Sequence, residues 1–125
     1  MCNNIIEVKR LNEFVSSDLI RGHIDTMILR VLTDSDNYGY EIIKAISANS
    51  KGSYELKEPS LYTSLKRLEA AKLIESYWGD ESQGGRRKYY KITKSGEEEY
   101  KKSIQEWRLA REIINQLIER NEKNE

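Results

Sequence analysis

The chain has 125 residues, 34% of them charged, and a formal net charge of zero. This length suits one domain, or a small domain with an added element. One cysteine (Cys2) and one histidine (His23) exclude an intrachain disulfide and a conventional structural zinc site. No apolar run approaches the roughly 18 residues of a membrane span, and the N-terminus lacks a signal-peptide pattern, so we expect a cytoplasmic protein.

Residues 1–17 are expected to form a helical extension. Apolar residues recur there at helical spacing, at Ile5, Val8, Leu11 and Val15. From Asp18 to Leu32 the apolar pattern strengthens, with repeats at i, i+3 and i+4. Asp18 suits the N-cap, so one continuous helix is predicted to open a domain that spans residues 18–93.

Two further helices follow in this domain. The turn-forming run TDSDNYG ends the first helix, and a second begins near Tyr38 or Gly39. It ends before Gly52, which can adopt a left-handed cap. The third helix opens at EPSLYTSLKRLEAAKLI, with Pro59 in its first turn. The residues predicted to be buried in these two helices are Ile42, Ile43, Ile46, Leu61, Leu65, Leu68 and Leu73.

A hairpin with a basic tip is predicted next, with strands near Ile74–Trp78 and Arg87–Thr93. Three consecutive cations, Arg86, Arg87 and Lys88, follow two glycines. Residues 54–94 carry nine basic and six acidic residues, a net charge of +3, whereas residues 95–125 carry six and eight, a net charge of −2. Positive charge is therefore concentrated in the segment that holds the hairpin.

Residues 94–125 are expected to form a dimerisation helix and a short polar tail. The run TKSGEEEY predicts a start capped by Thr93 or Ser95, and the helix continues to about Arg120. A heptad seam runs along it through Tyr100, Ile104, Trp107, Arg111, Ile114 and Ile118. Nothing left in the chain covers this seam, so a second copy is the simplest partner. The expected dimer contacts are Tyr100, Ile104, Trp107, Ile114 and Ile118.

The predicted fold class is mainly α with a small β-hairpin, arranged as a winged helix-turn-helix followed by a long C-terminal helix. The third helix of such a domain enters the major groove of DNA, and the hairpin lays its cations along the phosphates. The expected DNA contacts are Tyr38, Tyr40, Ser60, Tyr62, Thr63, Lys66, Arg67, Arg86, Arg87 and Lys88.

Two alternatives stay open at this point. The basic tip suits DNA better than a merely solvated loop, because the third helix has exposed cations of its own. For Tyr62, core packing and phosphate contact are equally compatible with the pattern. No constellation for catalysis is present, so we expect neither an enzyme nor a bound metal or cofactor.

The segments YGYEI, EPSLYTSLKRLEAAKLI and SYWGDESQGGRRKYYKIT, in this order, resemble the PadR family of transcriptional regulators in its short branch with one C-terminal helix. The resemblance implies a homodimeric repressor that binds an inverted repeat in double-stranded DNA. It also implies control of the protein's own gene and of a neighbouring exporter or detoxification gene.

The segment EWRLAREII resembles a drug-binding member of that family, in which planar drugs slot between paired tryptophans. Trp107 falls at the matching position, while Arg111 replaces an acid that favours cationic drugs. We therefore expect a pocket for neutral or anionic planar aromatic compounds, or one that Arg111 closes by pairing with an acid. The alternative is a DNA-binding dimer without small-molecule input, with Trp107 as interface core. The residues implied for the pocket are Leu19, Thr26, Met27, Arg30, Tyr100, Ser103, Trp107 and Arg111.

Overall fold

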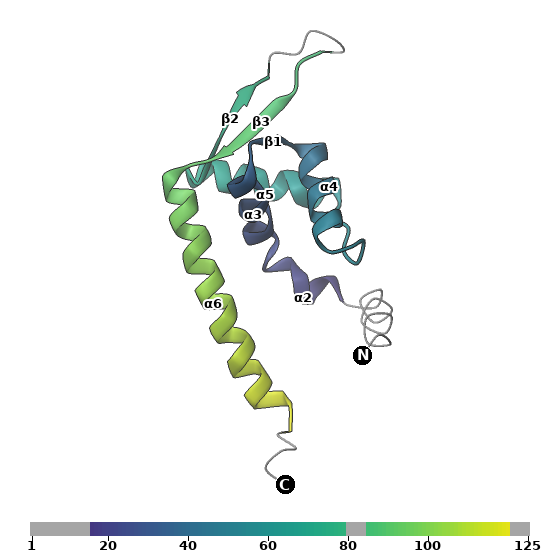
Figure 1. Cartoon of the computed structure of the whole chain (residues 1–125), viewed down its shortest axis with the longest axis vertical. Helices are drawn as coiled ribbons and strands as arrows, with labels where there is room; N and C mark the ends of the chain where they lie inside the picture. The colour runs from purple at the N-terminus through teal and green to yellow at the C-terminus, as the bar shows by residue number, and fades with distance from the viewer. Residues whose placement is uncertain (1–15, 80–84, 121–125) are drawn as a thin grey trace.

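A computed structural model describes residues 16–79 and 85–120. These residues form a mostly helical domain with a small antiparallel sheet, and a long helix leaves the domain at its C-terminal end (Figure 1). The expected helix over residues 1–17 lies almost wholly outside the described residues. The elements are α2 (Ser17–Arg21), α3 (Ile24–Asp34), β1 (Asn37–Tyr38), α4 (Gly39–Asn49), α5 (Glu58–Ala70), β2 (Ile74–Trp78), β3 (Lys88–Ile92) and α6 (Lys94–Ile118).

The first helix of the domain is two helices, so the prediction of one continuous helix from Asp18 was wrong. Gly22 ends α2, and α3 begins two residues later. Glycine has a low helix propensity, although the apolar pattern continues across it. The predicted cap was also wrong, because the side chain of Ser16 caps α2 by accepting a hydrogen bond of 3.1 Å from the backbone N–H of Asp18.

One hydrophobic core joins α3, α4, α5 and the sheet. Its fully buried side chains include Ile28, Ile42, Leu61 and Ile74. The predicted burial is confirmed for the helix residues except Ile43 and Leu73, which are half-buried. Leu73 lies beyond the end of α5, because Lys72 adopts a positive φ of 64° and turns the chain toward β2.

The sheet has the strand order β1-β3-β2 and is antiparallel throughout. The predicted bounds of β2 are confirmed, and β3 is one residue shorter at each end than predicted. Strand β1 was not predicted, because its two residues are too few to show a period. It pairs Tyr38 with Tyr89, and β2 pairs Tyr77 with Tyr89 on its other side. We call the hairpin of β2 and β3 the wing.

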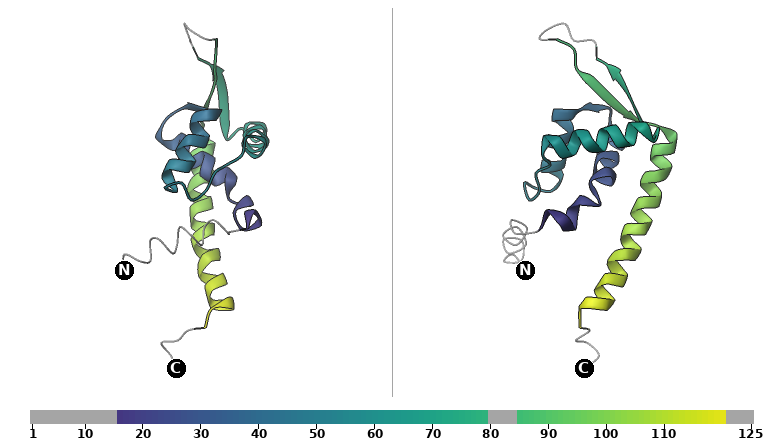
Figure 2. Two further views of the ribbon diagram at one scale, coloured as in Figure 1. Left: turned by 90° about the vertical axis from the view of Figure 1, so that its right-hand side faces the viewer. Right: turned by 180° about the vertical axis from the view of Figure 1, so that it is seen from behind.

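Helix α6 begins at the base of the wing and extends away from the domain (Figure 2). Thr93 caps it, as one of the two predicted caps, because its Oγ1 accepts a hydrogen bond of 3.0 Å from the N–H of Gly96. The same oxygen donates to the carbonyl of Leu73 at 3.0 Å, which ties the helix start to the turn before β2.

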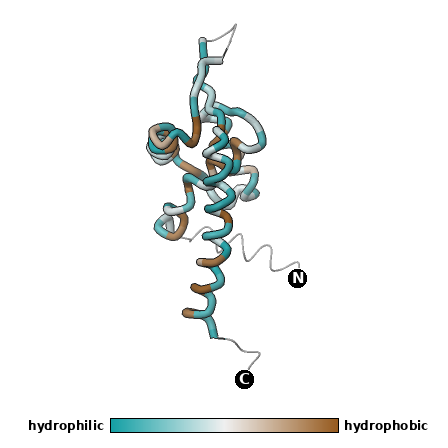
Figure 3. The backbone as a smooth tube through the Cα atoms, turned by 90° about the vertical axis from the view of Figure 1, so that its left-hand side faces the viewer, coloured by the Kyte–Doolittle hydropathy of each residue, from teal (hydrophilic) through white to brown (hydrophobic). Residues whose placement is uncertain are grey.

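Hydrophobic residues recur along the outer part of α6, as the brown bands of the tube in Figure 3 show. Their side chains are exposed, so the domain does not cover them. They are Trp107, Leu109, Ile113, Ile114, Leu117 and Ile118, all more than 40% exposed. Between residues 16 and 120, apart from the undescribed 80–84, no helix has the length and apolar character needed to cross a membrane.

Candidate nucleic-acid interface

Helix α5 presents a polar outer face beside the wing. Lys57 precedes the helix with extended backbone, and Pro59 lies in the first turn, where its missing N–H leaves no hydrogen bond unmade. The inner face buries Leu61, Leu65 and Leu68. This periodicity turns the other face outward, and Ser60, Tyr62, Thr63, Lys66 and Arg67 are all exposed on it.

Arg67 is engaged by another helix. Its Nε and Nη2 donate to the two carboxylate oxygens of Asp25 on α3, at 2.9 and 2.8 Å. Its Nη2 also donates to Ser64 at 3.1 Å. The hydrogen bonds to Asp25 raise the pKa of the guanidinium further. Arg67 thus holds α5 against α3, and its charge is largely balanced before any DNA contact.

Five of the predicted DNA contacts line one groove of about 370 Å³ between the start of α4, α5 and the wing. Tyr38 and Tyr40 come from the β1–α4 junction, Tyr62 from α5, and Arg87 and Lys88 from the wing. Aromatic edges and two cations thus face the same opening, as a nucleic-acid backbone requires. Sequence reasoning missed two lining residues, Gly39 and Tyr90.

Gly39 lets Tyr62 lie close to the start of α4. A Cβ built at Gly39 would be 2.5 Å from the hydroxyl oxygen of Tyr62. The Tyr62 side chain remains 49% exposed. Both interpretations of Tyr62 therefore hold in part, because one edge packs on the α4 backbone and the rest is open to the groove.

A set of stacked aromatic rings supports the wing cations. The Arg87 guanidinium lies over the ring of Tyr38, 4.7 Å from its centroid. Tyr89 contacts Tyr38 edge-on at 5.4 Å and stacks on Tyr77 at 5.7 Å. Tyr77 donates a 2.6 Å hydrogen bond to Asp36, and this bond raises the pKa of the Tyr77 hydroxyl. The wing is therefore ordered by ring contacts as well as by backbone pairing.

The remaining predicted contacts lie elsewhere on the same domain. Ser60, Thr63 and Arg67 line a second groove, of about 550 Å³, along the opposite flank of α5. Arg21 and Lys57 line it as well, and sequence reasoning missed both. Lys66 is exposed between the two grooves. Arg86 lies over the ring of Trp78, 5.3 Å from its centroid.

A larger cavity of about 710 Å³ lies between α2, α3, α4 and α6. It contains six of the residues implied for a ligand pocket, namely Leu19, Thr26, Met27, Arg30, Tyr100 and Trp107. Arg30 is paired there with Asp34 at 2.6 Å. His23, which sequence reasoning did not include, meets the Trp107 ring edge-on at a centroid distance of 4.9 Å. No periodic signal marks His23, because it lies in the break between α2 and α3.

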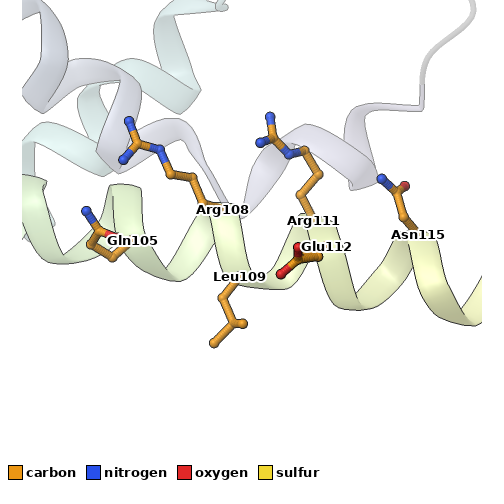
Figure 4. Close-up of a pocket in the computed structure, with 6 residues that line it drawn as sticks. All are labelled: Gln105, Arg108, Leu109, Arg111, Glu112 and Asn115. Atoms are coloured by element: carbon orange, nitrogen blue, oxygen red, sulfur yellow. The ribbon is translucent and has the colours of Figure 1, made fainter.

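The other two residues implied for that pocket lie apart from it. The hydroxyl of Ser103 is 3.4 Å from Glu99 one turn earlier on α6. Arg111 lines a separate groove along α6, together with Gln105, Arg108, Leu109, Glu112 and Asn115 (Figure 4). In this view Arg108 and Arg111 extend from one side of the helix and Leu109 from the other. Arg111 therefore does not meet Trp107 in the cavity of a single chain.

Among residues 16–79 and 85–120, no three His, Cys, Asp or Glu side chains gather into a group that could hold a metal ion. The polar groups that do gather are cations, hydroxyls and aromatic rings at the wing and α5. This chemistry fits a polyanion.

Comparison with known proteins finds a family of transcriptional regulators and solved structures of such regulators. A profile of the transcriptional regulator PadR-like family matches residues 28–102. An uncharacterized protein X from Lysinibacillus sphaericus is 46% identical over 105 residues, covering 84% of this chain and 96% of that protein. The structure of a transcriptional regulator from Clostridium thermocellum has a TM-score of 0.76 at 43% identity, covering 82% of this chain and 99% of that one. A PadR family transcription regulator from Clostridium difficile has a TM-score of 0.65 at 40% identity, covering 77% and 98%.

Proposed function

Because the chain belongs to the PadR-like family of transcriptional regulators, we propose that it is a dimeric repressor that binds an inverted repeat in double-stranded DNA. Residues 18–93 form the DNA-binding domain in this proposal, and residues 94–125 the dimerisation helix and polar tail. Its targets are its own gene and a neighbouring exporter or detoxification gene. A regulator of this kind acts where the chromosome lies, so the proposed location is the cytoplasm.

One observation carries the DNA-binding part of the proposal. The groove between α4, α5 and the wing combines Tyr62 of the helix with Arg87 and Lys88 of the wing. In a winged helix-turn-helix the third helix reads base edges, and the wing contacts the adjacent backbone. Selection of duplexes from a randomised library tests this, and the expected product is a two-fold repeat. Changes of Ser60, Thr63 or Lys66 to Ala should alter the selected sequence.

The dimer part rests on α6. Its exposed apolar side chains recur on one broad face, with Trp107, Ile114 and Ile118 on the predicted seam. Tyr100 and Ile104 of that seam are half-buried against the chain's own domain, so the expectation that nothing in the chain covers the seam was wrong at these two positions. Burying them against a second copy gains free energy that one chain cannot gain alone. Sedimentation equilibrium should show a dimer. Changing Ile114 and Ile118 together to Ser should shift the equilibrium toward monomer and weaken binding to the two-fold site. The helicity of residues 18–93 should stay unchanged.

A second, more specific function is supported by the cavity at Trp107. We propose that it takes planar aromatic compounds, because Trp107 offers a flat ring beside Met27 and Tyr100. Titration with planar aromatic compounds of positive, zero and negative charge should quench tryptophan fluorescence saturably, and the charge dependence shows whether Arg111, which lies outside this cavity in one chain, affects binding. The signal should vanish in Trp107→Phe. If no compound quenches, the alternative of a DNA-binding dimer without small-molecule input is favoured.

A further inference from the structure

The outer end of the wing carries an exposed indole beside a cation, outside the groove that contains Arg87. Trp78 is the last residue of β2 and is 55% exposed. The guanidinium of Arg86 lies over its ring at 5.3 Å from the centroid. An exposed indole on a polar hairpin gains nothing from the core, so its ring is available for contact with a partner.

The indole lies on a regular part of the hairpin. Trp78 is directly paired with Lys88. The ladder continues one step further, because the N–H of Gly79 donates a 2.7 Å hydrogen bond to the carbonyl of Arg87. A Cβ at Gly79 would be 2.5 Å from a ring carbon of Tyr89, so the glycine lets this ring pack against the strand end. The position of Trp78 is therefore set by the sheet.

Register also determines which face of the wing Trp78 occupies. Directly paired residues share one face of a sheet, and the pairs Ile74–Ile92, Ser76–Tyr90 and Trp78–Lys88 alternate along the hairpin on the same face. The inner members of this face, Ile74 and Tyr90, belong to the core that α5 covers. Trp78 and Lys88 are thus its outward continuation, on the side of the proposed recognition helix.

Lys88 connects this face to the proposed DNA groove. It lines the groove together with Tyr62 and Tyr90, and it is also the strand partner of Trp78. Arg86 supplies a second cation at the same end of the wing. An occupant that touches Trp78 therefore meets the Arg86 guanidinium over the indole and Lys88 on the paired strand, which favours a polyanion over an apolar protein surface.

We propose that Trp78 and Arg86 form a minor-groove contact that flanks the site read by α5. The indole packs against the deoxyribose walls, and the guanidinium that it orients enters the groove. The narrow minor groove of A·T-rich DNA attracts arginine most strongly, so the pair selects A·T-rich flanks. This inference rests on the proposed DNA-binding function and adds a specificity-determining pair to it.

Fluorescence tests the contact directly. The chain has two tryptophans, so the parent is compared with Trp78→Phe, and the spectral change that only the parent shows belongs to Trp78. The probe is a duplex selected by the parent protein from a randomised library, and its anisotropy reports complex formation. Binding should shift the Trp78 emission to shorter wavelength and reduce quenching by acrylamide. A complex that forms with unchanged emission and quenching would overturn the inference alone. If no duplex is bound, the proposed function fails and the inference fails with it.

Flank preference tests the specificity. The parent should bind a duplex with A·T flanks about tenfold more tightly than one with G·C flanks. Inosine·cytosine flanks, which lack the minor-groove amino group of guanine, should restore binding. Each of the variants Trp78→Ala and Arg86→Ala should bind the A·T-flanked and the G·C-flanked duplex with equal affinity. Lys91→Ala, which removes a cation from the opposite face of the wing, should keep the preference. Equal flank binding by the parent would contradict the proposal.

Discussion

Arg67 on α5 donates two hydrogen bonds, of 2.9 and 2.8 Å, to the carboxylate of Asp25 on α3, although the two residues are 42 positions apart in the chain. The side chains are 57% and 32% exposed, so the pair is screened by solvent. Its bidentate geometry nevertheless fixes the angle between α5, the proposed recognition helix, and α3.

Asp25 and Arg67 should stabilise the folded chain as an interacting pair. Asp25→Ala and Arg67→Ala should each lower the free energy of unfolding, and the double variant should lose less than the sum. The expected coupling energy is about 0.5 to 1 kcal/mol, because the pair is partly exposed. Urea unfolding of the four proteins measures it. Strict additivity would show that the ion pair contributes nothing to stability.

Gly39→Ala should weaken DNA binding with little loss of stability. The added Cβ would be 2.5 Å from the Tyr62 hydroxyl and 3.0 Å from the adjoining ring carbon. Tyr62 is half-exposed and can turn away, so unfolding should change by less than about 1 kcal/mol. Affinity for the selected duplex should fall, because the ring leaves the groove. Combining the change with Tyr62→Ala should add no further loss of affinity. A fully additive loss would mean that the two residues act separately.

Gly96→Ala should destabilise the chain strongly. Its Cβ would overlap the backbone carbonyl of Leu73, which cannot turn aside as a side chain can. We expect a loss of about 2 kcal/mol or more, measured by thermal and urea unfolding. Gly22→Ala is the matched control, because nothing lies within 4 Å of its Cβ and its φ of −69° suits alanine. The free energy of unfolding of Gly22→Ala should stay unchanged or rise. Equal effects at the two glycines would contradict the packing at the base of the wing.

Stability should fall as the pH rises above about 10, the usual pKa of tyrosine. Burial raises the pKa of Tyr90, with smaller contributions from Glu69 and Tyr62. Above pH 10 the unfolded chain therefore loses this proton more readily than the folded chain, which favours unfolding. In Tyr90→Phe the free energy of unfolding should decline less steeply between about pH 9 and 11. Identical slopes for parent and variant would exclude Tyr90 as a contributor.

Local patterns predicted most of the elements. The strand β2 and the start of α4 follow from aromatic and β-branched residues bounded by turn formers. The break at Gly22 was missed because apolar periodicity continues across it. Strand β1 was missed because two residues show no period.

The candidate site was predicted by residue type and only partly by arrangement. The cations of the wing and the outer face of α5 follow from composition and helical period. Partners that are distant in sequence do not, such as Asp25 for Arg67 or His23 for Trp107. Such pairs depend on how helices pack, which no short segment encodes. The same holds for Arg111, since a seam defined by spacing alone does not say which neighbour each position meets.

The central claim is that the wing and α5 bind duplex DNA, and the salt dependence of binding by Arg87→Ala tests it most directly. Affinity for the selected duplex is measured by fluorescence anisotropy over a series of salt concentrations. Each phosphate contact contributes about 0.9 to the slope of log affinity against log salt. Arg87→Ala should bind more weakly and flatten the slope by about one, whereas Lys102→Ala, an exposed cation on α6, should match the parent. An unchanged slope in Arg87→Ala, or equal losses in the two variants, would contradict the account.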